Sequence, residues 1–190
     1  MKRYLFLVLV PAILLSTSCR KNPSIVIETG LGDITAKLFP EKAPATVANF
    51  LRYVDGGLFD NSCFYRVVRS DNQPRDSIKI AVIQGGRYNE EDETFPPVVH
   101  ERTDFTGIRH SDGTVSMARW QPGTATSEFF ITIGDQPALD AGGMRNSDGE
   151  GFAAFGRVTH GMEVVLKIHS IEAPDQYLSD TVPIRRIYRK

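Results

Sequence analysis

Two neighbouring segments decide the fold: Gly113-Thr-Val-Ser-Met-Ala-Arg119 and, after a short loop, Thr124-Ala-Thr-Ser-Glu-Phe-Phe-Ile-Thr132. Residues 114–117 form a short apolar and β-branched run, and residues 129–133 form a second one. The loop between them is rich in turn residues, including a Pro-Gly pair. Runs of this kind, bounded by turn residues, predict two β-strands that flank an exposed loop. Such loops often carry function.

Short strands separated by turn residues continue along the chain. The expected strands are residues 24–29, 33–39, 64–68, 79–84, 114–117, 129–133, 155–158 and 183–188. The first two alternate apolar and polar residues around Gly30-Leu31-Gly32, which predicts a hairpin. Many short strands with only two helices are typical of a barrel or a sandwich. The strand pattern alone does not distinguish these two folds.

The two expected helices have clear boundaries and apolar faces. The first begins at Pro44 and ends at a Gly-Gly pair, with apolar residues at positions 47, 50, 51 and 54. This spacing places the apolar residues on one face of a helix. The second helix covers residues 161–168, and we expect Met162, Val165 and Leu166 to form its apolar face.

Six sequence blocks resemble those of the bacterial branch of cyclophilin-type peptidyl-prolyl cis-trans isomerases. The blocks are Phe64-Tyr-Arg-Val-Val68, Val82-Ile-Gln-Gly-Gly86, residues 113–119, residues 124–132, Leu139-Asp140 and Phe152-Ala-Ala-Phe-Gly-Arg-Val158. They cover most of residues 24–172 in the order expected for the family. The resemblance implies one isomerase domain over residues 24–190, mainly β, with a closed eight-stranded antiparallel β-barrel capped by two α-helices. It also implies an enzyme that accelerates rotation of X-Pro bonds without a cofactor.

An arginine suits the chemistry of prolyl isomerisation. The amide bond has a rotation barrier of about 20 kcal/mol, so a catalyst has to favour the twisted state, in which the prolyl nitrogen regains a lone pair. A guanidinium stays charged, has donors in a rigid fork and acts more strongly in a water-poor pocket. Arg66 is the candidate, and a period-2 strand would place it on one face with Phe64 and Val68. The strand pattern alone favours an exposed arginine, whereas the resemblance implies the catalytic role.

The resemblance implies further site residues. Gln84 would be the second catalytic residue and would hydrogen-bond the substrate backbone. The pocket for proline would have Phe130 as its floor, Val82 as its wall and Leu139 at its rim, although the bare sequence would place all three in the core. The other implied substrate-binding positions are Ala118 and Arg119, where the family pairs its backbone with that of the substrate, together with Glu128 and Phe152.

Several positions depart from the best-known family members. Ala81 and Val82 replace larger residues and predict a wider pocket, and Ala138 lacks a bulky aromatic ring at the rim. Glu128 stands in place of a glutamine, and Phe152 in place of a histidine or a tyrosine. These changes keep open an alternative function, a non-catalytic or weakly catalytic module of the same fold that binds proline-containing peptides. The presence of both catalytic candidates favours the enzyme.

The N-terminus has the pattern of a bacterial lipoprotein signal. Two basic residues precede an apolar stretch of about a dozen residues, which is shorter than the roughly 20 needed to span a membrane, and small residues then precede Cys19. We therefore expect residues 1–18 to be a signal peptide and Cys19 to be lipidated. Residues 19–23 would tether the domain to a bacterial membrane outside the cytoplasm. Because Ser16 replaces the usual aliphatic residue, ordinary cleavage with an incidental Cys19 is the alternative.

Charge and cysteine content limit the partners. The chain has 22 Lys+Arg and 23 Asp+Glu, so loss of Lys2 and Arg3 with the leader leaves 20 against 23, a net charge of −3. This charge gives no electrostatic footprint for nucleic acid. Lipidation of Cys19 would leave Cys63 as the only other cysteine, so no intrachain disulfide could form. The four histidines lack metal-ligand spacing. We expect a monomer that binds proline-containing polypeptides and no metal.

Two loops are long. Residues 69–78 form an insertion between the block that contains Arg66 and the block that contains Gln84, where the resemblance implies a tight turn. Residues 141–151 are rich in glycine and polar residues. Long loops of this kind are often functional or mobile.

Overall fold

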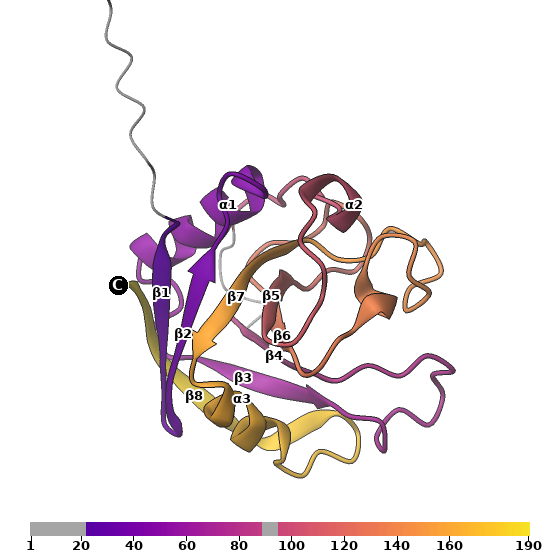
Figure 1. The fold of residues 1–190 in the computed structure, drawn as a ribbon. Helices are drawn as coiled ribbons and strands as arrows, with labels where there is room; N and C mark the ends of the chain where they lie inside the picture. The colour runs from indigo at the N-terminus through magenta and orange to yellow at the C-terminus, as the bar shows by residue number, and fades with distance from the viewer. Residues whose placement is uncertain (1–21, 89–94) are drawn as a thin grey trace, which may run out of the picture.

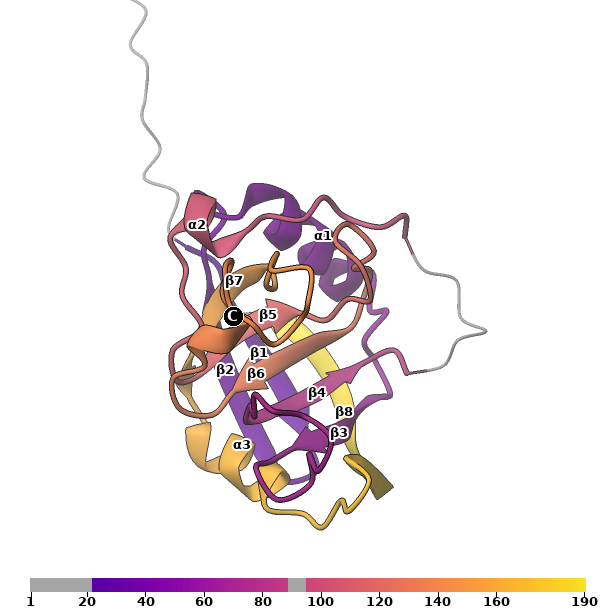
Figure 2. The same cartoon turned by 90° about the vertical axis from the view of Figure 1, so that its right-hand side faces the viewer.

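The computed structural model describes residues 22–88 and 95–190. Eight antiparallel strands close a barrel in the order β1-β2-β7-β5-β6-β4-β3-β8 (Figures 1 and 2). The strands are β1 (Ser24–Thr29), β2 (Gly32–Leu38), β3 (Ser62–Val68), β4 (Val82–Gly86), β5 (Thr114–Met117), β6 (Phe129–Thr132), β7 (Ala154–His160) and β8 (Tyr177–Arg189). The closed eight-stranded barrel is therefore confirmed, and the sandwich is excluded.

The expectations for the leader fall outside this part of the chain. The signal peptide over residues 1–18, the lipidated Cys19 and the start of the 19–23 tether lie outside the described residues. Within residues 22–88 and 95–190, no helix is both long enough and apolar enough to cross a membrane.

Two helices cover opposite ends of the barrel. α1 (Pro44–Asp55) lies at the upper end and α3 (Met162–His169) at the lower end in both views (Figures 1 and 2). The structure adds a four-residue helix, α2 (Thr103–Thr106), and a 3-10 turn, η1 (Pro137–Leu139). The sequence did not predict these two elements, because segments of three or four residues are too short to show helical periodicity.

The barrel interior and α1 share one aromatic core. Phe50 of α1 is fully buried, and its ring centroid lies 5.0 Å from those of Phe59 and Phe155 and 5.5 Å from that of Phe129. Full burial of a side chain of this size contributes about 1.5–3 kcal/mol. These contacts hold α1 against β6 and β7.

The buried face of α3 differs from the prediction. Val164, Val165 and Ile168 are buried, whereas Leu166 is 49% exposed, so the placement of Leu166 on the core-facing side is wrong. The physical reason lies in β2. Val164 fills the space above Gly32, where an added Cβ would lie only 2.8 Å from the valine Cγ2. A helix rotated to bury Leu166 would lose this close contact.

Two strands begin three or more residues away from the predicted start. β4 begins at Val82 rather than at residue 79, because the backbone of Ile80 bonds to the buried side chain of Gln73 instead of joining the strand ladder. β8 begins at Tyr177 rather than at residue 183, and this first residue pairs with Arg66 of β3. The early start of β8 brings a distant part of the chain next to the candidate catalytic arginine.

A bulge in β3 separates the main core from a second apolar cluster. Both ladders of β3 shift register between Phe64 and Arg66. Phe64 packs in the main core, whereas Val68 belongs to the second cluster. The prediction that Phe64 shares a face with Arg66 and Val68 is therefore wrong, because a bulge interrupts the alternation of side chains. The second cluster consists of Val68, Ile80, Val82, Phe130 and Leu139, with Ala118 and Phe152 packed against it.

Candidate active site

All nine catalytic and substrate-binding residues predicted from the sequence border one groove of about 1050 Å³. They are Arg66, Val82, Gln84, Ala118, Arg119, Glu128, Phe130, Leu139 and Phe152. They come from β3, β4, β6, η1 and the loops around β5 and before β7. Barrel closure therefore brings together side chains that lie far apart in the sequence.

One part of the groove is apolar. Phe130 is buried there with Val82 and Leu139 beside it, all in the second cluster. The ring of Phe152 stands edge-on to Phe130, with 5.3 Å between the centroids. Ile80, which the sequence pattern did not mark, completes this lining. An apolar hollow of this kind fits a small aliphatic ring such as the side chain of proline.

A second part of the groove is polar and contains Arg66 and Gln84. Arg66 Nη1 donates to Gln84 Oε1 at 3.0 Å, and Gln84 Nε2 donates to the Tyr65 hydroxyl at 2.6 Å. On the other side of the guanidinium, Nε and Nη2 donate to Gln176 Oε1 at 3.2 and 2.5 Å. These bonds hold the Arg66 guanidinium in one orientation.

The charge of Arg66 is not neutralised by its hydrogen bonds. All three go to neutral amide oxygens, those of Gln84 and Gln176. Burial lowers the pKa of Arg66, yet a guanidinium stays protonated at physiological pH. A charged donor that is partly removed from water interacts more strongly than the same donor in bulk solvent. The groove therefore presents a fixed positive charge close to an apolar hollow.

Glu128 supports the groove next to the end of β4. An added Cβ on Gly86, which has a φ of 148°, would lie 2.5 Å from Glu128 Oε1. Burial raises the pKa of Glu128, and hydrogen bonds from the Tyr65 hydroxyl and the Arg87 backbone offset only part of this rise. Its Oε2 is buried without a hydrogen-bond partner among the described residues. An ionised carboxylate is therefore unfavourable at this position.

We expect Glu128→Gln to stabilise the protein at neutral pH. The folded-state pKa of Glu128 is raised above the unfolded value of about 4.3, so the folded state binds this proton more tightly. Stability therefore falls as the pH rises from about 4.3 through the folded-state pKa, and it stays lower above that pKa. Urea unfolding near pH 4 and near pH 7.5 measures the difference. We expect Glu128→Gln to raise the free energy of unfolding near pH 7.5 but not near pH 4. An equal change at both pH values would contradict this expectation.

The Arg119 side chain is occupied within the protein. Its guanidinium, on a side chain only 1% exposed, donates to both carboxylate oxygens of Asp148 at 2.8 and 3.0 Å and to the carbonyl of Gly151 at 2.6 and 2.8 Å. The bonds from Arg119 to the Asp148 carboxylate, together with the backbone N–H of Glu150, lower the pKa of Asp148 to about 2. The side chain of Arg119 thus anchors the 141–151 loop, and only the backbone at this position is left for a substrate.

A Ser-His-Asp arrangement lies beneath the apolar part of the groove. His110 bonds through Nδ1 to Asp140 Oδ1 at 2.8 Å and through Nε2 to Ser116 Oγ at 3.0 Å, and its ring stacks on that of Phe130 at 5.8 Å. Ser116 is completely buried, so its hydroxyl cannot reach a substrate. The arrangement is therefore a buried polar network that supports Phe130 rather than a nucleophilic triad.

Aromatic residues that the sequence pattern did not mark extend the groove beside Arg66. Tyr65 stacks on Tyr88 at 4.3 Å and on Tyr177 at 6.4 Å. Trp120, which is 91% exposed, also borders the groove. The position of Tyr65 next to Arg66 in the strand was an available signal. Tyr177 and its neighbour Gln176 lie outside every motif block, so no sequence signal pointed to them.

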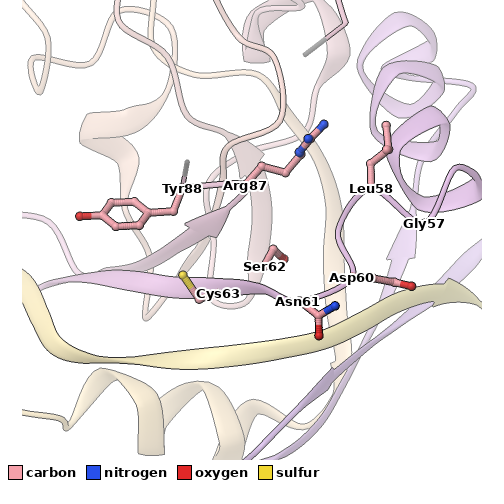
Figure 3. A pocket seen from close by; sticks show the side chains of 8 residues that line it. All are labelled: Gly57, Leu58, Asp60, Asn61, Ser62, Cys63, Arg87 and Tyr88. Carbon is pink, nitrogen blue, oxygen red and sulfur yellow. The ribbon is translucent and has the colours of Figure 1, made fainter. Parts of the chain in front are cut away.

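A smaller hollow of about 410 Å³ lies beside the groove. Figure 3 shows the residues that line it, including Cys63 of β3 and Arg87 and Tyr88 after β4. Cys63 is half-buried, and burial raises the pKa of its thiol. A thiol with a raised pKa is a weak nucleophile. Because Arg87 and Tyr88 also line the larger groove, the two hollows are neighbours.

Comparison with known proteins identifies relatives over almost the whole described chain. A family model described as cyclophilin type peptidyl-prolyl cis-trans isomerase/CLD matches residues 24–189. Peptidyl-prolyl cis-trans isomerase B of Escherichia coli (strain K12) is 34% identical over 163 residues, which cover 84% of this chain and 92% of the relative. Peptidyl-prolyl cis-trans isomerase A of Dickeya dadantii (strain 3937) is 34% identical over 167 residues, which cover 86% of this chain and 80% of the relative.

Solved structures share the fold. The crystal structure of a cyclophilin type peptidyl-prolyl cis-trans isomerase of Cryptosporidium parvum matches with a TM-score of 0.70 and 22% identity, over 89% of this chain and 98% of that chain. A crystal structure of the same protein in the presence of the dipeptide Ala-Pro matches with a TM-score of 0.68, over 87% of this chain and 97% of that chain.

Proposed function

Because the chain belongs to the cyclophilin-type peptidyl-prolyl cis-trans isomerases, we propose that the groove is its active site and that Arg66 and Gln84 are the catalytic residues. One observation carries this proposal. The Arg66 guanidinium is fixed by neutral partners in the same groove as the apolar hollow on Phe130. Gln84 pairs in register with both Arg66 and Phe130, so a proline ring bound on Phe130 would lie next to the Arg66–Gln84 pair.

In this proposal, Arg66 acts on the prolyl nitrogen. In the planar amide the nitrogen lone pair is delocalised, whereas in the twisted state it is available to accept a hydrogen bond. A guanidinium N–H directed at that nitrogen binds the twisted state more strongly than the planar state. Only such a difference in binding accelerates the reaction. No proton has to be transferred and no covalent intermediate has to form.

Gln84 would bind the substrate backbone and so fix one side of the rotating bond. Its amide orientation is set at both atoms, since Oε1 accepts from Arg66 and Nε2 donates to the Tyr65 hydroxyl. An amide nitrogen has two hydrogens, so the second is available for a substrate carbonyl. The proline ring would be held on Phe130 and the substrate carbonyl by Gln84. Rotation would then be confined to the peptide bond that joins the proline to the preceding residue.

The substrates of this proposal are exposed X-Pro bonds in polypeptides. A protein of the same fold was solved in the presence of the dipeptide Ala-Pro, which supports proline-containing peptides as the ligand class. A refolding assay with a substrate whose slow phase is proline-limited tests the proposal, because uncatalysed isomerisation takes tens of seconds. Acceleration of this phase by catalytic amounts of the purified protein is the expected result.

The second candidate function is binding of proline-containing peptides without isomerisation of their X-Pro bonds. It rests on the altered residues, but the groove lining includes Val82, Glu128 and Phe152 and does not include Ala81 or Ala138. Two of the five altered positions therefore do not line the groove. Saturable binding of an X-Pro peptide with no acceleration of its isomerisation would identify this function and overturn the enzymatic assignment.

We also propose that the protein acts outside the cytoplasm, held on a bacterial membrane by a lipidated Cys19. The support is the order of a basic start, a short apolar stretch and small residues before the cysteine. In the mature chain only residues 20–23 would separate the lipid from β1, which begins at Ser24. The domain would therefore lie close to the membrane surface, where it would meet proteins folding outside the cytoplasm.

We expect the mature protein to begin at an acylated Cys19. Mass spectrometry of detergent-extracted protein should show a lipid-modified N-terminal cysteine. The added mass should correspond to two or more acyl chains, because a single chain gives only a marginal anchor. Cys19→Ser should abolish the modification and release the protein from the membrane fraction, whereas Cys63→Ser should leave both unchanged. An unmodified wild-type chain in the soluble fraction would disprove the anchor.

A further inference from the structure

Gln176 has an unfavourable backbone conformation immediately before β8. Its φ is 70°, in the left-handed region, and Asn61 is the other non-glycine residue with a positive φ in the described chain. Asparagine adopts this region more readily than glutamine. A residue in such a conformation persists only where its surroundings hold it there, and these residues are frequent at functional sites. A glutamine with this backbone conformation is therefore expected to have a functional role for its side chain.

The backbone of Gln176 is tied to the strand that carries Arg66. The Val67 N–H donates to the Gln176 carbonyl at 2.8 Å, and the Gln176 N–H donates to the Ala173 carbonyl at 3.0 Å. Val67 follows Arg66 directly in β3. These two bonds fix the backbone position of Gln176, so that its side chain extends from a point beside the Arg66 guanidinium.

The Gln176 side chain then binds the guanidinium from the side away from Gln84. Its Oε1 accepts from Nη2 of Arg66 at 2.5 Å and from Nε at 3.2 Å, while its Nε2 donates to the Asn72 carbonyl at 3.1 Å. The bond to Asn72 fixes the amide orientation, so that the oxygen rather than the nitrogen faces the cation. As a neutral acceptor, Gln176 orients the charge without neutralising it.

The insertion over residues 69–78 supplies this support. Asn72 is 5% exposed, and its Nδ2 donates to the carbonyls of Val67 and Ala173 at 3.0 and 2.8 Å. Gln73 is completely buried and bonds to the backbone of Arg69 and Ile80. The first half of the insertion is thus packed into the molecule and connects β3 to the residues before β8.

We propose that Gln176 is a positioning residue for Arg66 and that the 69–78 insertion supports it through Asn72. This inference rests on the proposed catalytic role of Arg66. Gln176 does not line the groove, so it would act through the arginine and not on the substrate. Its loss should lower kcat, because the guanidinium would no longer be held in the orientation that the twisted state requires, while KM should change little.

Two variants separate this role from a purely structural one. Gln176→Asn keeps a residue that tolerates a positive φ, but its shorter side chain does not reach Arg66. Gln176→Gly relieves the backbone conformation entirely. Both should lower kcat by about ten- to a hundredfold with little change in KM. The melting temperature should stay close to the wild-type value, because relief of the positive φ offsets the lost side-chain hydrogen bonds. Asn61→Gly is the matched control, because it relieves the same conformation at a residue that does not line the groove, and its kcat should be unchanged.

A second measurement does not depend on turnover. In the wild-type protein the Arg66 Nε–H bonded to Gln176 should give a resolved NMR signal that exchanges slowly with water, and both Gln176 variants should lose it. If the wild-type protein proves inactive, the proposed function fails, and this signal still decides whether Gln176 holds Arg66. Wild-type kcat in both Gln176 variants of an active enzyme, or an unchanged Nε–H signal, would overturn the inference.

Discussion

Replacing Arg66 with alanine is expected to slow catalysis by roughly a hundred- to a thousandfold. Removal of one preorganised donor from a transition state typically costs about 2.7–4 kcal/mol, and the Arg66 guanidinium is such a donor, held by Gln84 and Gln176. The loss should appear in kcat/KM for an X-Pro peptide in a protease-coupled assay. Binding of the same peptide should weaken far less, because the apolar hollow on Phe130 is unchanged.

Arg66→Lys is expected to restore little of this loss. An ammonium is a point charge without the planar fork, so it cannot bond Gln84, Gln176 and the substrate at fixed angles. The rate of the wild-type enzyme should also be flat over roughly pH 6 to 9, because a guanidinium does not titrate there. A bell-shaped pH profile would assign the chemistry to a histidine or a carboxylate and contradict the role of Arg66.

Replacing Phe130 with alanine is expected to damage both stability and substrate binding. Phe130 is 4% exposed, stacks on His110 and meets Phe152 edge-on. Truncation of a buried phenylalanine typically costs about 3–5 kcal/mol of folding free energy. The groove also loses its floor, and a loss of about 1.4 kcal/mol of contact with the proline ring would raise KM about tenfold. Denaturant unfolding and steady-state kinetics measure the two effects.

Phe105→Ala is the matched control for this experiment. Phe105 belongs to α2 and is 83% exposed, so the same truncation removes little buried area. Its stability should change by no more than about 0.5 kcal/mol, and its KM should not change. If Phe130→Ala kept wild-type KM while remaining folded, the proline ring would bind elsewhere in the groove.

The local pattern predicted the strands, but only the family resemblance of the motif blocks predicted that they close into a barrel. Alternating strands fit a sandwich as well as a barrel, since both bury one face of each strand. Two predictions that rested on local pattern alone were overridden by tertiary contacts. Leu166 faces solvent because Val164 fits over Gly32, and Phe64 faces the main core because β3 carries a bulge after it.

The candidate site was likewise predictable only where the motif blocks covered it. The residues predicted to bind or turn the substrate lie in the motif blocks, and they border one groove. The orienting partners that lie outside the motif blocks were not predictable. Gln176 and Tyr177 reach Arg66 only because β8 begins early and pairs with β3, which no local sequence pattern specifies. The role of the Arg119 side chain depends on its bonds to Asp148, which joins it from a distant loop.

The central claim is that the Arg66 guanidinium favours the twisted state of an X-Pro bond bound in this groove. NMR exchange spectroscopy of an X-Pro peptide at saturating enzyme tests it directly, because it measures cis-trans interconversion on the enzyme separately from binding. The account predicts that Arg66→Ala slows the interconversion of bound peptide by roughly a hundred- to a thousandfold. Equal on-enzyme rates in the wild-type protein and the variant, with the peptide bound in both, would contradict it.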